Sequence, residues 1–280
     1  MKTEWRPTLA VIGGSGMYQL PGSQLLDQLN VETPFGSPSA AISMVKFNDQ
    51  LLAFLPRHGP AHRVAPQQIN HRANLWALAS VGVRAVISSA AVGSLVAGQP
   101  RGSFSVISDF FDRTWGRADT FYDGGSAAGV QHLPAADAFC PQLRSLLIDS
   151  LRELAEPHQQ QAVVAVINGP RFSSPAESAW LTAAGAELIS MTQYPEPVLA
   201  AELNLGYAAL AYITDADTGH DGSEPVSAAL VMSRLGEAQP RIQAVLSVLV
   251  SKLAASYQPQ ERVPAAAVAA VLQLPTSAGA

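Results

Sequence analysis

The sequence predicts an α/β fold: a single domain in which a mixed central β-sheet is flanked by α-helices. Short β-branched runs alternate with helical patterns along the chain, which is typical of layered α/β proteins. No internal repeat or linker-like change in composition divides the 280 residues, of which 48% are hydrophobic. A chain of this length can bury a substantial core as one unit. We therefore expect one domain over residues 1–280, with its core in 8–256.

The expected strands are short apolar runs, most of which end in Gly, Ser, Thr, Asp or Pro. In chain order they lie at residues 9–12, 41–47, 51–55, 85–89, 104–107, 162–167, 187–190 and 207–213. Small residues follow the apolar run 85–87, so residues 88–95 are expected to form a turn that a ligand could approach.

The expected helices are recognised by periodicity and by their end signals. They lie at residues 67–80, 142–155, 175–184, 196–204, 226–256 and 264–273. Pro141 opens the second of these helices, and Pro175 and Gly185 bracket the third. Pro240 is expected to interrupt the long helix near its middle.

Two segments lack periodicity. Residues 114–140 form the longest of them, and loops of that length in compact domains usually bind a ligand or form an interface. The alternative is a disordered insert, which the aromatic residues Trp115, Phe121 and Tyr122 argue against. The terminal residues 275–280 are expected to be a flexible tail.

Composition excludes several classes of protein. The formal charge of −5 and the isoelectric point near 5.6 argue against a broad nucleic-acid surface, which needs clustered Lys and Arg. Cys140 is the only cysteine, so no intramolecular disulfide and no thiolate metal cage can form. The apolar segment near the N-terminus is shorter than that of a signal peptide, and no segment has the length of a membrane span. We expect a cytoplasmic protein.

The stretch LAVIGGSGMYQL, residues 9–20, runs from an apolar strand into a turn rich in glycine. A dinucleotide fingerprint would need a third glycine where Gln19 stands, and a P-loop would need a lysine that this turn lacks. A nucleophile elbow would need glycine in place of Met17. Two interpretations stay open: a tight structural turn, or backbone N–H groups that hold an anion together with the Ser15 hydroxyl.

Another strand end carries Arg57 and His58, in the stretch LPRHGPAH. Ligands collect at the carboxyl ends of strands in α/β sheets, and a guanidinium offers a planar fork for phosphate. The alternative is a surface arginine with a capping histidine. A zinc site at His58 and His62 is disfavoured, because Pro60 prevents the helix that would align them.

Asp215 and Asp217 follow the last expected strand. Two carboxylates one residue apart can converge on one ligand if the backbone there is extended. A calcium loop is disfavoured, because Gly219, His220 and Val226 occupy positions where such a loop needs other residues. A solvated acidic loop is the alternative.

Taken together, the motifs resemble the S-methyl-5′-thioadenosine phosphorylases of the purine nucleoside phosphorylase family. They occur in the expected order over about residues 9–255: GGSG, TPFGSPSA, RHGPAH, INHRANLWAL, AVGSL, DFFDRT, GPRFSSPAES, SMTQYPEPVLAAE and TDAD. The resemblance implies a purine nucleoside phosphorylase-like sheet, a homotrimer, and no metal or organic cofactor. It also implies phosphorolysis of methylthioadenosine to adenine and 5-methylthioribose 1-phosphate, with inorganic phosphate as co-substrate.

The resemblance also implies roles for individual residues. Phosphate would be held by Ser15, Arg57, His58, Thr192 and the backbone of Ala91. Met191 would contact the ribose, Phe172 and Ser173 would border the base, and His132 would come from a neighbouring subunit to the 5′-substituent. Asp215 and Asp217 would be the catalytic pair on the purine. One position departs from the family: Ala90 stands where a threonine is common.

In the mechanism that we expect, phosphate attacks C1′ while Asp215 supplies a proton to N7 and Asp217 orients it or binds the 6-amino group. Relatives that act on inosine-type substrates typically carry Asn at the position of Asp215, whereas this chain carries Asp. A methylthioinosine or general purine nucleoside phosphorylase is therefore the alternative. Less favoured classes are a hydrolytic nucleosidase, a serine hydrolase that uses Ser15, and a nucleoside-binding protein without activity.

Overall fold

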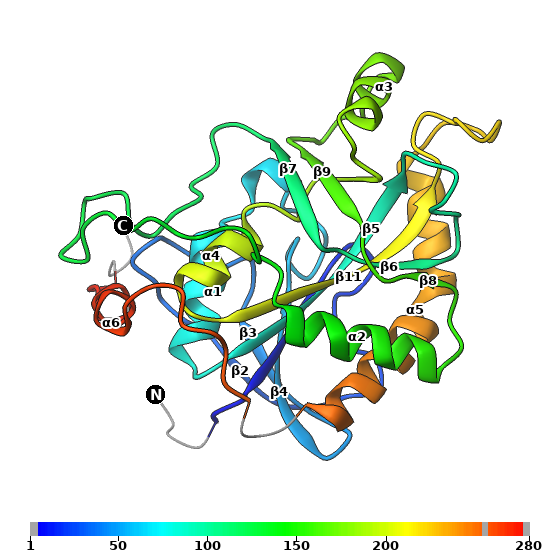
Figure 1. Cartoon of the computed structure of the whole chain (residues 1–280). Helices are drawn as coiled ribbons and strands as arrows, with labels where there is room; N and C mark the ends of the chain where they lie inside the picture. Colours follow the sequence, from blue (N-terminus) through cyan, green and yellow to red (C-terminus); the bar gives the residue numbers. More distant parts are fainter. Residues whose placement is uncertain (1–4, 254–256, 277–280) are drawn as a thin grey trace.

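The structure, a computed structural model, describes residues 5–253 and 257–276 (Figure 1). The strands are β1 (Leu9–Gly13), β2 (Gln24–Leu29), β3 (Ile42–Phe47), β4 (Gln50–Pro56), β5 (Ala85–Ser94), β6 (Phe104–Val106), β7 (Asp109–Arg113), β8 (His158–Gln159), β9 (Val163–Ile167), β10 (Leu188–Ser190) and β11 (Gly206–Asp215). The helices are α1 (His71–Ser80), α2 (Pro141–Glu153), α3 (Pro175–Ala183), α4 (Glu196–Glu202), α5 (Ala228–Lys252) and α6 (Ala265–Leu272), with a short 3₁₀ turn η1 (Pro66–Gln68).

The strands form one mixed sheet, as the sequence predicts. Its main path runs β2-β3-β4-β1-β5-β10-β9-β7, and β11, β6 and β8 extend it from β5 as a branch. β5 lies at the branch point, because it pairs in parallel with β1 and β11 and antiparallel with β10. The carboxyl ends of β1, β4 and β11 therefore meet at one edge of the sheet, close to the second half of β5.

Helices cover both faces of the sheet (Figure 1). Because side chains alternate along a strand, Ala10 and Ile12 of β1 face the core beneath α1, α4 and α6, while Leu9 and Val11 face the core beneath α2 and α5. A smaller cluster packs α3 against β9 and β10 through Leu181, which is buried. The sheet is thus held between two apolar layers, and its edge is left to the loops.

Every expected strand and helix is present, with shifted ends, and three strands were not expected: β2, β7 and β8. The turn expected at residues 88–95 is wrong, because β5 continues to Ser94. Its small side chains are buried between neighbouring strands. The first expected helix begins only at His71, after the η1 turn.

The long helix was expected over residues 226–256 with an interruption at Pro240. Instead, α5 runs from Ala228 to Lys252 with Pro240 inside it. The end of that expectation, residues 254–256, lies outside the described residues, as do residues 277–280 of the expected flexible tail. None of the helices in the described ranges is both long and apolar enough to cross a membrane.

The segment 114–140 contains no helix, and its only regular pairing among the described residues is a single bridge between Asp123 and Val130. The segment is nevertheless attached to the core, because Phe121 and Tyr122 are both buried. Trp115 points outward and is 70% exposed. The expectation of an ordered loop rather than a disordered insert is therefore confirmed.

Candidate active site

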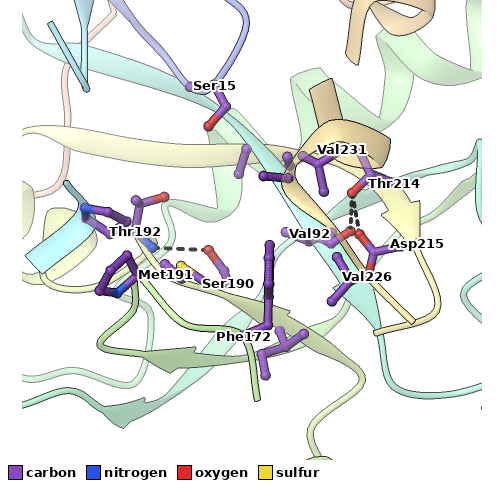
Figure 2. Close-up of a pocket in the computed structure, with 18 of the residues that line it drawn as sticks. Ser15, Val92, Phe172, Ser190, Met191, Thr192, Thr214, Asp215, Val226 and Val231 are labelled. Carbon is purple, nitrogen blue, oxygen red and sulfur yellow. Dashed lines mark hydrogen bonds between the residues drawn. The ribbon is translucent and has the colours of Figure 1, made fainter. Parts of the chain in front are cut away.

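A cavity of about 390 Å³ opens at the edge of the sheet where β1, β4, β10 and β11 end. Ten of the expected site residues line it: Ser15, Arg57, His58, Ala91, Phe172, Ser173, Met191, Thr192, Asp215 and Asp217. His132 does not line it and lies exposed in the 114–140 segment. Figure 2 shows Ser15 and Thr192 on one side of the cavity and Asp215 on the other, with the Phe172 side chain between Met191 and Asp215.

The glycine turn after β1 forms one end of the cavity. Gly14 donates its N–H to Ser89 Oγ at 3.0 Å, and Gly16 has a φ of 79°, a conformation that favours glycine. A Cβ at Gly14 would lie 2.6 Å from the carbonyl oxygen of Ser89, so the turn and β5 can approach this closely only without a side chain there. The turn brings Ser15 to the cavity wall.

Arg57 follows β4 directly, and its side chain is fully buried. Its planar fork is occupied within the protein: Nε and Nη2 donate to the Glu196 carboxylate at 2.6 and 2.9 Å. Nη2 also donates to Ser88 Oγ at 2.5 Å, and Nη1 donates to the Ser89 carbonyl at 3.0 Å. A guanidinium has five N–H groups. Among the described residues one Nη1–H is left for a ligand, so a two-pronged contact to phosphate is not available.

Glu196, the first residue of α4, is buried and neutralises Arg57. Burial by itself would raise the pKa of Glu196, but Arg57 and His71 hold it well below its usual value. The Tyr207 hydroxyl donates to the same carboxylate at 2.7 Å. The end of the cavity with Ser15, Arg57 and Thr192, where the anion is expected and which we call the anion end, therefore has little net charge of its own. A bound anion would depend on hydrogen-bond donors.

His58 is the second side chain that β4 brings to this end. A carbonyl can only accept, so Nδ1–H donates to the Val64 oxygen at 2.9 Å, and Nε2 is the remaining ring nitrogen. Burial lowers the pKa of His58 to about 4, which keeps the ring neutral at pH 7. His62 stacks against it with 4.4 Å between ring centroids. In the neutral form Nε2 accepts a hydrogen bond, as from a protonated phosphate oxygen.

The opposite end holds the two aspartates, which are 3% and 2% exposed. Asp215 accepts hydrogen bonds from Thr214 Oγ1 at 2.7 Å and from the Asp217 backbone N–H at 2.9 Å. Burial raises the pKa of Asp215. These carboxylates do not form a solvated acidic loop. They converge for a different reason from the one expected, since Asp217 has a φ of 48° and the chain turns there instead of staying extended.

Two serine hydroxyls orient Asp217. Ser173 Oγ lies 2.9 and 3.0 Å from its two carboxylate oxygens, and Ser178 of α3 also donates to it. Ser173 therefore contacts Asp217, in addition to lining the cavity. Ser178 was not expected in the site, because its contact depends on how α3 packs.

Sequence reasoning also missed other residues of the cavity wall. Ser190 accepts the N–H of Thr192 at 3.2 Å, and its hydroxyl lies beside the anion end (Figure 2). An apolar wall is formed by Tyr18, Val226, Ala228, Val231 and Met232. The valines and Met232 come from α5 and the turn before it, so only the tertiary structure brings them to the site. Ala90 lines the cavity with a methyl group, so no hydroxyl is present there.

The cavity therefore has a buried carboxylate pair at one end and hydrogen-bond donors at the other, an arrangement that suits an enzyme acting on a base and an anion together. The family model described as Phosphorylase superfamily matches residues 8–251. The chain belongs to this family. Among the described residues no group of three or more His, Cys, Asp or Glu side chains is placed to hold a metal ion.

Individual relatives narrow the comparison. The chain is 42% identical to an S-methyl-5′-thioadenosine phosphorylase of Mycobacterium tuberculosis over 88% of this chain and 89% of the relative. It is 37% identical to a purine nucleoside phosphorylase of Streptomyces coelicolor, over 91% and 92%. Among solved structures, methylthioadenosine phosphorylase from Schistosoma mansoni in complex with adenine superposes with a TM-score of 0.83 at 32% identity, covering 88% of this chain and 91% of the other.

Proposed function

We propose that the protein is an S-methyl-5′-thioadenosine phosphorylase, a pentosyltransferase that converts S-methyl-5′-thioadenosine and inorganic phosphate to adenine and 5-methylthioribose 1-phosphate. The observation that carries the proposal is the cavity with a buried aspartate pair at one end and hydrogen-bond donors for an anion at the other. Relatives that share about 40% of its sequence carry this name, and a solved structure of similar fold binds methylthioadenosine.

In the proposed reaction the N9–C1′ bond breaks and a bond from a phosphate oxygen to C1′ forms. The sugar gains positive charge in the transition state and the purine gains negative charge, so a nearby anion and a proton donor both lower the barrier. We assign phosphate to Ser15, Thr192, His58, the Ala91 backbone and the Nη1–H of Arg57 that no described residue accepts. We assign the proton donated to N7 to Asp215, whose pKa burial raises.

The base would lie beside Phe172, with Met191 against the ribose. Asp217 would accept a hydrogen bond from the 6-amino group of adenine. The 6-oxo group of hypoxanthine is itself an acceptor, so it could not donate to Asp217. Sites built to hydrogen-bond a polar group discriminate strongly against substrates that lack it. The two serines that orient Asp217 support this role, because they fix its carboxylate in one direction.

The apolar wall of Tyr18, Val226, Ala228, Val231 and Met232 fits an uncharged 5′-methylthio group. We further propose that the active assembly is a homotrimer in which His132 of one subunit reaches the 5′-substituent of its neighbour. The proposed reaction needs no metal or organic cofactor, since phosphate is the nucleophile. We expect it to take place in the cytoplasm, in keeping with a single cysteine.

The test is a substrate panel of methylthioadenosine, methylthioinosine, adenosine and inosine, each with and without inorganic phosphate. We expect methylthioadenosine to be cleaved fastest, and only when phosphate is present. Release of adenine at the same rate without phosphate would identify a hydrolase instead. Faster cleavage of the inosine-type substrates would favour the purine nucleoside phosphorylase activity that the Streptomyces coelicolor relative is named for.

A further inference from the structure

Arg117, in the irregular segment 114–140, reaches from the surface to the backbone that forms the cavity. Its Nη2 donates to the Met191 carbonyl at 2.7 Å and to the Asn168 carbonyl at 3.3 Å, and its Nη1 donates to the Tyr194 carbonyl. Arg117 itself is absent from the cavity wall. One guanidinium thus joins two separate chain segments near the candidate ligand.

Both segments carry cavity residues. Met191 and Thr192 line the cavity between β10 and α4. Ile167 at the end of β9 and Pro170 after it also line the cavity. The segments also touch directly: a Cβ at Gly169 would lie 2.6 Å from Met191 Sδ. Glycine at this position lets the Met191 side chain pack on the turn, while Arg117 holds the Met191 carbonyl. The backbone and the side chain of Met191 are therefore restrained by two separate contacts.

Neighbouring residues of the same segment fasten it to the same part of the molecule. The Tyr194 hydroxyl donates to Asp119 at 2.6 Å. At the other end of α4, the Glu202 carboxylate accepts Thr120 Oγ1 and the Phe121 N–H, both at 2.7 Å. Residues 117–121 are therefore bonded along the chain segment from Met191 to Glu202, with Arg117 at the end nearest the cavity.

We propose that Arg117 is a positioning residue that fixes the position of the Met191 and Thr192 backbone relative to the active-site cavity. The inference rests on the proposed function and deepens it. Arginine suits three carbonyl oxygens from two segments because its planar guanidinium holds several donors in fixed directions, whereas the donors of lysine rotate at the end of a flexible chain. Without Arg117 the Met191–Tyr194 turn loses the restraint that keeps the Thr192 side chain at the cavity wall.

The expected kinetic effect falls on ligands that Met191 and Thr192 touch. A displacement of about 1 Å from a change outside the chemistry can cost about 10²-fold in rate. For Arg117→Ala we expect kcat/KM to fall by roughly 10- to 100-fold, with a higher KM for phosphate and a lower kcat. Asp215, at the other end of the cavity, keeps its contacts, so the pH dependence of kcat should be unchanged.

The experiment compares Arg117→Ala with Arg144→Ala. Arg144 of α2 also binds backbone carbonyls, those of Ile107 and Gln160, each at 3.0 Å, but neither residue lines the cavity. Both variants lose the same kind of bond, so Arg144→Ala controls for loss of stability. Each is assayed with millimolar guanidinium, which can refill the Arg117 space, and with urea, a neutral molecule of similar shape. Thermal unfolding and circular dichroism report folding.

The proposal predicts that Arg117→Ala is folded, that guanidinium but not urea restores its kcat/KM, and that Arg144→Ala has the constants of the unaltered enzyme. Unchanged constants in Arg117→Ala, an equal loss in Arg144→Ala, or no recovery with guanidinium would overturn it. If Arg117→Ala does not fold, Arg117→Lys decides, with the same expected loss. If the unaltered protein cleaves no nucleoside, the proposed function fails, and weaker phosphate binding by Arg117→Ala in calorimetry still tests the positioning role.

Discussion

Single residues in the candidate site are defined by their buried partners more than by their own chemistry. Asp215 and Asp217 have the same side chain, but burial raises the pKa of Asp215, while two serine hydroxyls orient Asp217. A buried carboxyl with a raised pKa suits the proton donor, and an oriented carboxylate suits the acceptor for an amino group. The environment thus distinguishes two chemically identical groups, in keeping with the two proposed roles.

The role of Asp215 is tested by Asp215→Asn. The amide cannot donate a proton to the departing purine, so kcat for methylthioadenosine should fall by roughly 10² to 10⁴. Turnover of 6-oxopurine nucleosides should fall less or improve. Steady-state assays on both substrates measure this, with Asp221→Asn in the exposed loop as the control. A kcat within a factor of about two of the unaltered enzyme would remove Asp215 from acid catalysis.

The buried, neutral His58 makes the stability of the protein depend on pH. Its pKa is lowered from an ordinary 6.5 to about 4, because burial disfavours the charged ring. The contribution of this neutral ring to the free energy of unfolding is therefore complete above pH 6.5. It is lost as the pH falls toward 4, by roughly 3 kcal/mol at most. Urea unfolding without phosphate from pH 7 to 4 should show a smaller loss for His58→Asn than for the unaltered protein. His220→Asn, an exposed histidine, should leave the loss unchanged.

Elements were predictable where burial follows a simple pattern. The runs that became β1, β4 and β11 are apolar throughout, and the structure confirms them. β2 and β7 are mostly exposed and carry polar residues, so their sequences resemble loops until their neighbours are known. The predicted strand at residues 85–89 is shorter than β5 for the opposite reason. The side chains in the second half of β5 are small and partly polar, yet they are buried between strands.

The same limit applies to the site. Ser15, Arg57 and the aspartates stand at strand ends, where periodicity alone points to a ligand. No local sequence pattern identifies the residues that come from other elements. Arg117 reaches the backbone of the site from a loop, and Ser178 and Val231 reach the site from helices. Sequence could propose Arg57 for phosphate, but it could not reveal that Glu196 occupies most of its donors.

Helix α5 offers a test at the scale of one element. Gly236 lies in its exposed part, and a Cβ there would meet nothing within 4 Å. Gly236→Ala should stabilise the protein by about 0.5–1 kcal/mol, because alanine loses less conformational freedom in a helix. Gly185, after α3, also has open space but a φ of 98°, so Gly185→Ala should destabilise. Urea unfolding of both variants separates propensity from packing, and a destabilised Gly236→Ala would contradict the expectation.

On the scale of the whole molecule, the surface suggests that the chain has a partner of its own kind. Large apolar side chains are exposed on and near the 114–140 segment: Phe111, Trp115, Val130 and Trp180. Large exposed apolar patches on a protein surface mark interaction sites. His132 lies exposed in the same segment and does not line the active-site cavity of its own chain. These features support the proposed homotrimer.

The shared site is tested by His132→Ala. If a neighbouring subunit lends this side chain to the 5′-substituent, kcat/KM for methylthioadenosine should fall by roughly 10-fold. The binding of free adenine, which has no 5′-group, should not change. Sedimentation at the assay concentration should show a trimer for both proteins. A monomer with full activity would contradict the proposed assembly, and equal losses for methylthioadenosine and adenine would contradict the role of His132.

The buried Arg57–Glu196 pair has a consequence for how substrate arrives and product leaves. The protein has a net charge of −5, and the buried Arg57 is already neutralised by Glu196. It therefore does not attract anions over a long distance, and phosphate capture relies on short contacts made after collision. Its rate of entry should vary little with ionic strength. The same lack of long-range attraction leaves the sugar phosphate free to depart, which suits an enzyme that must exchange one anion for another in every turnover.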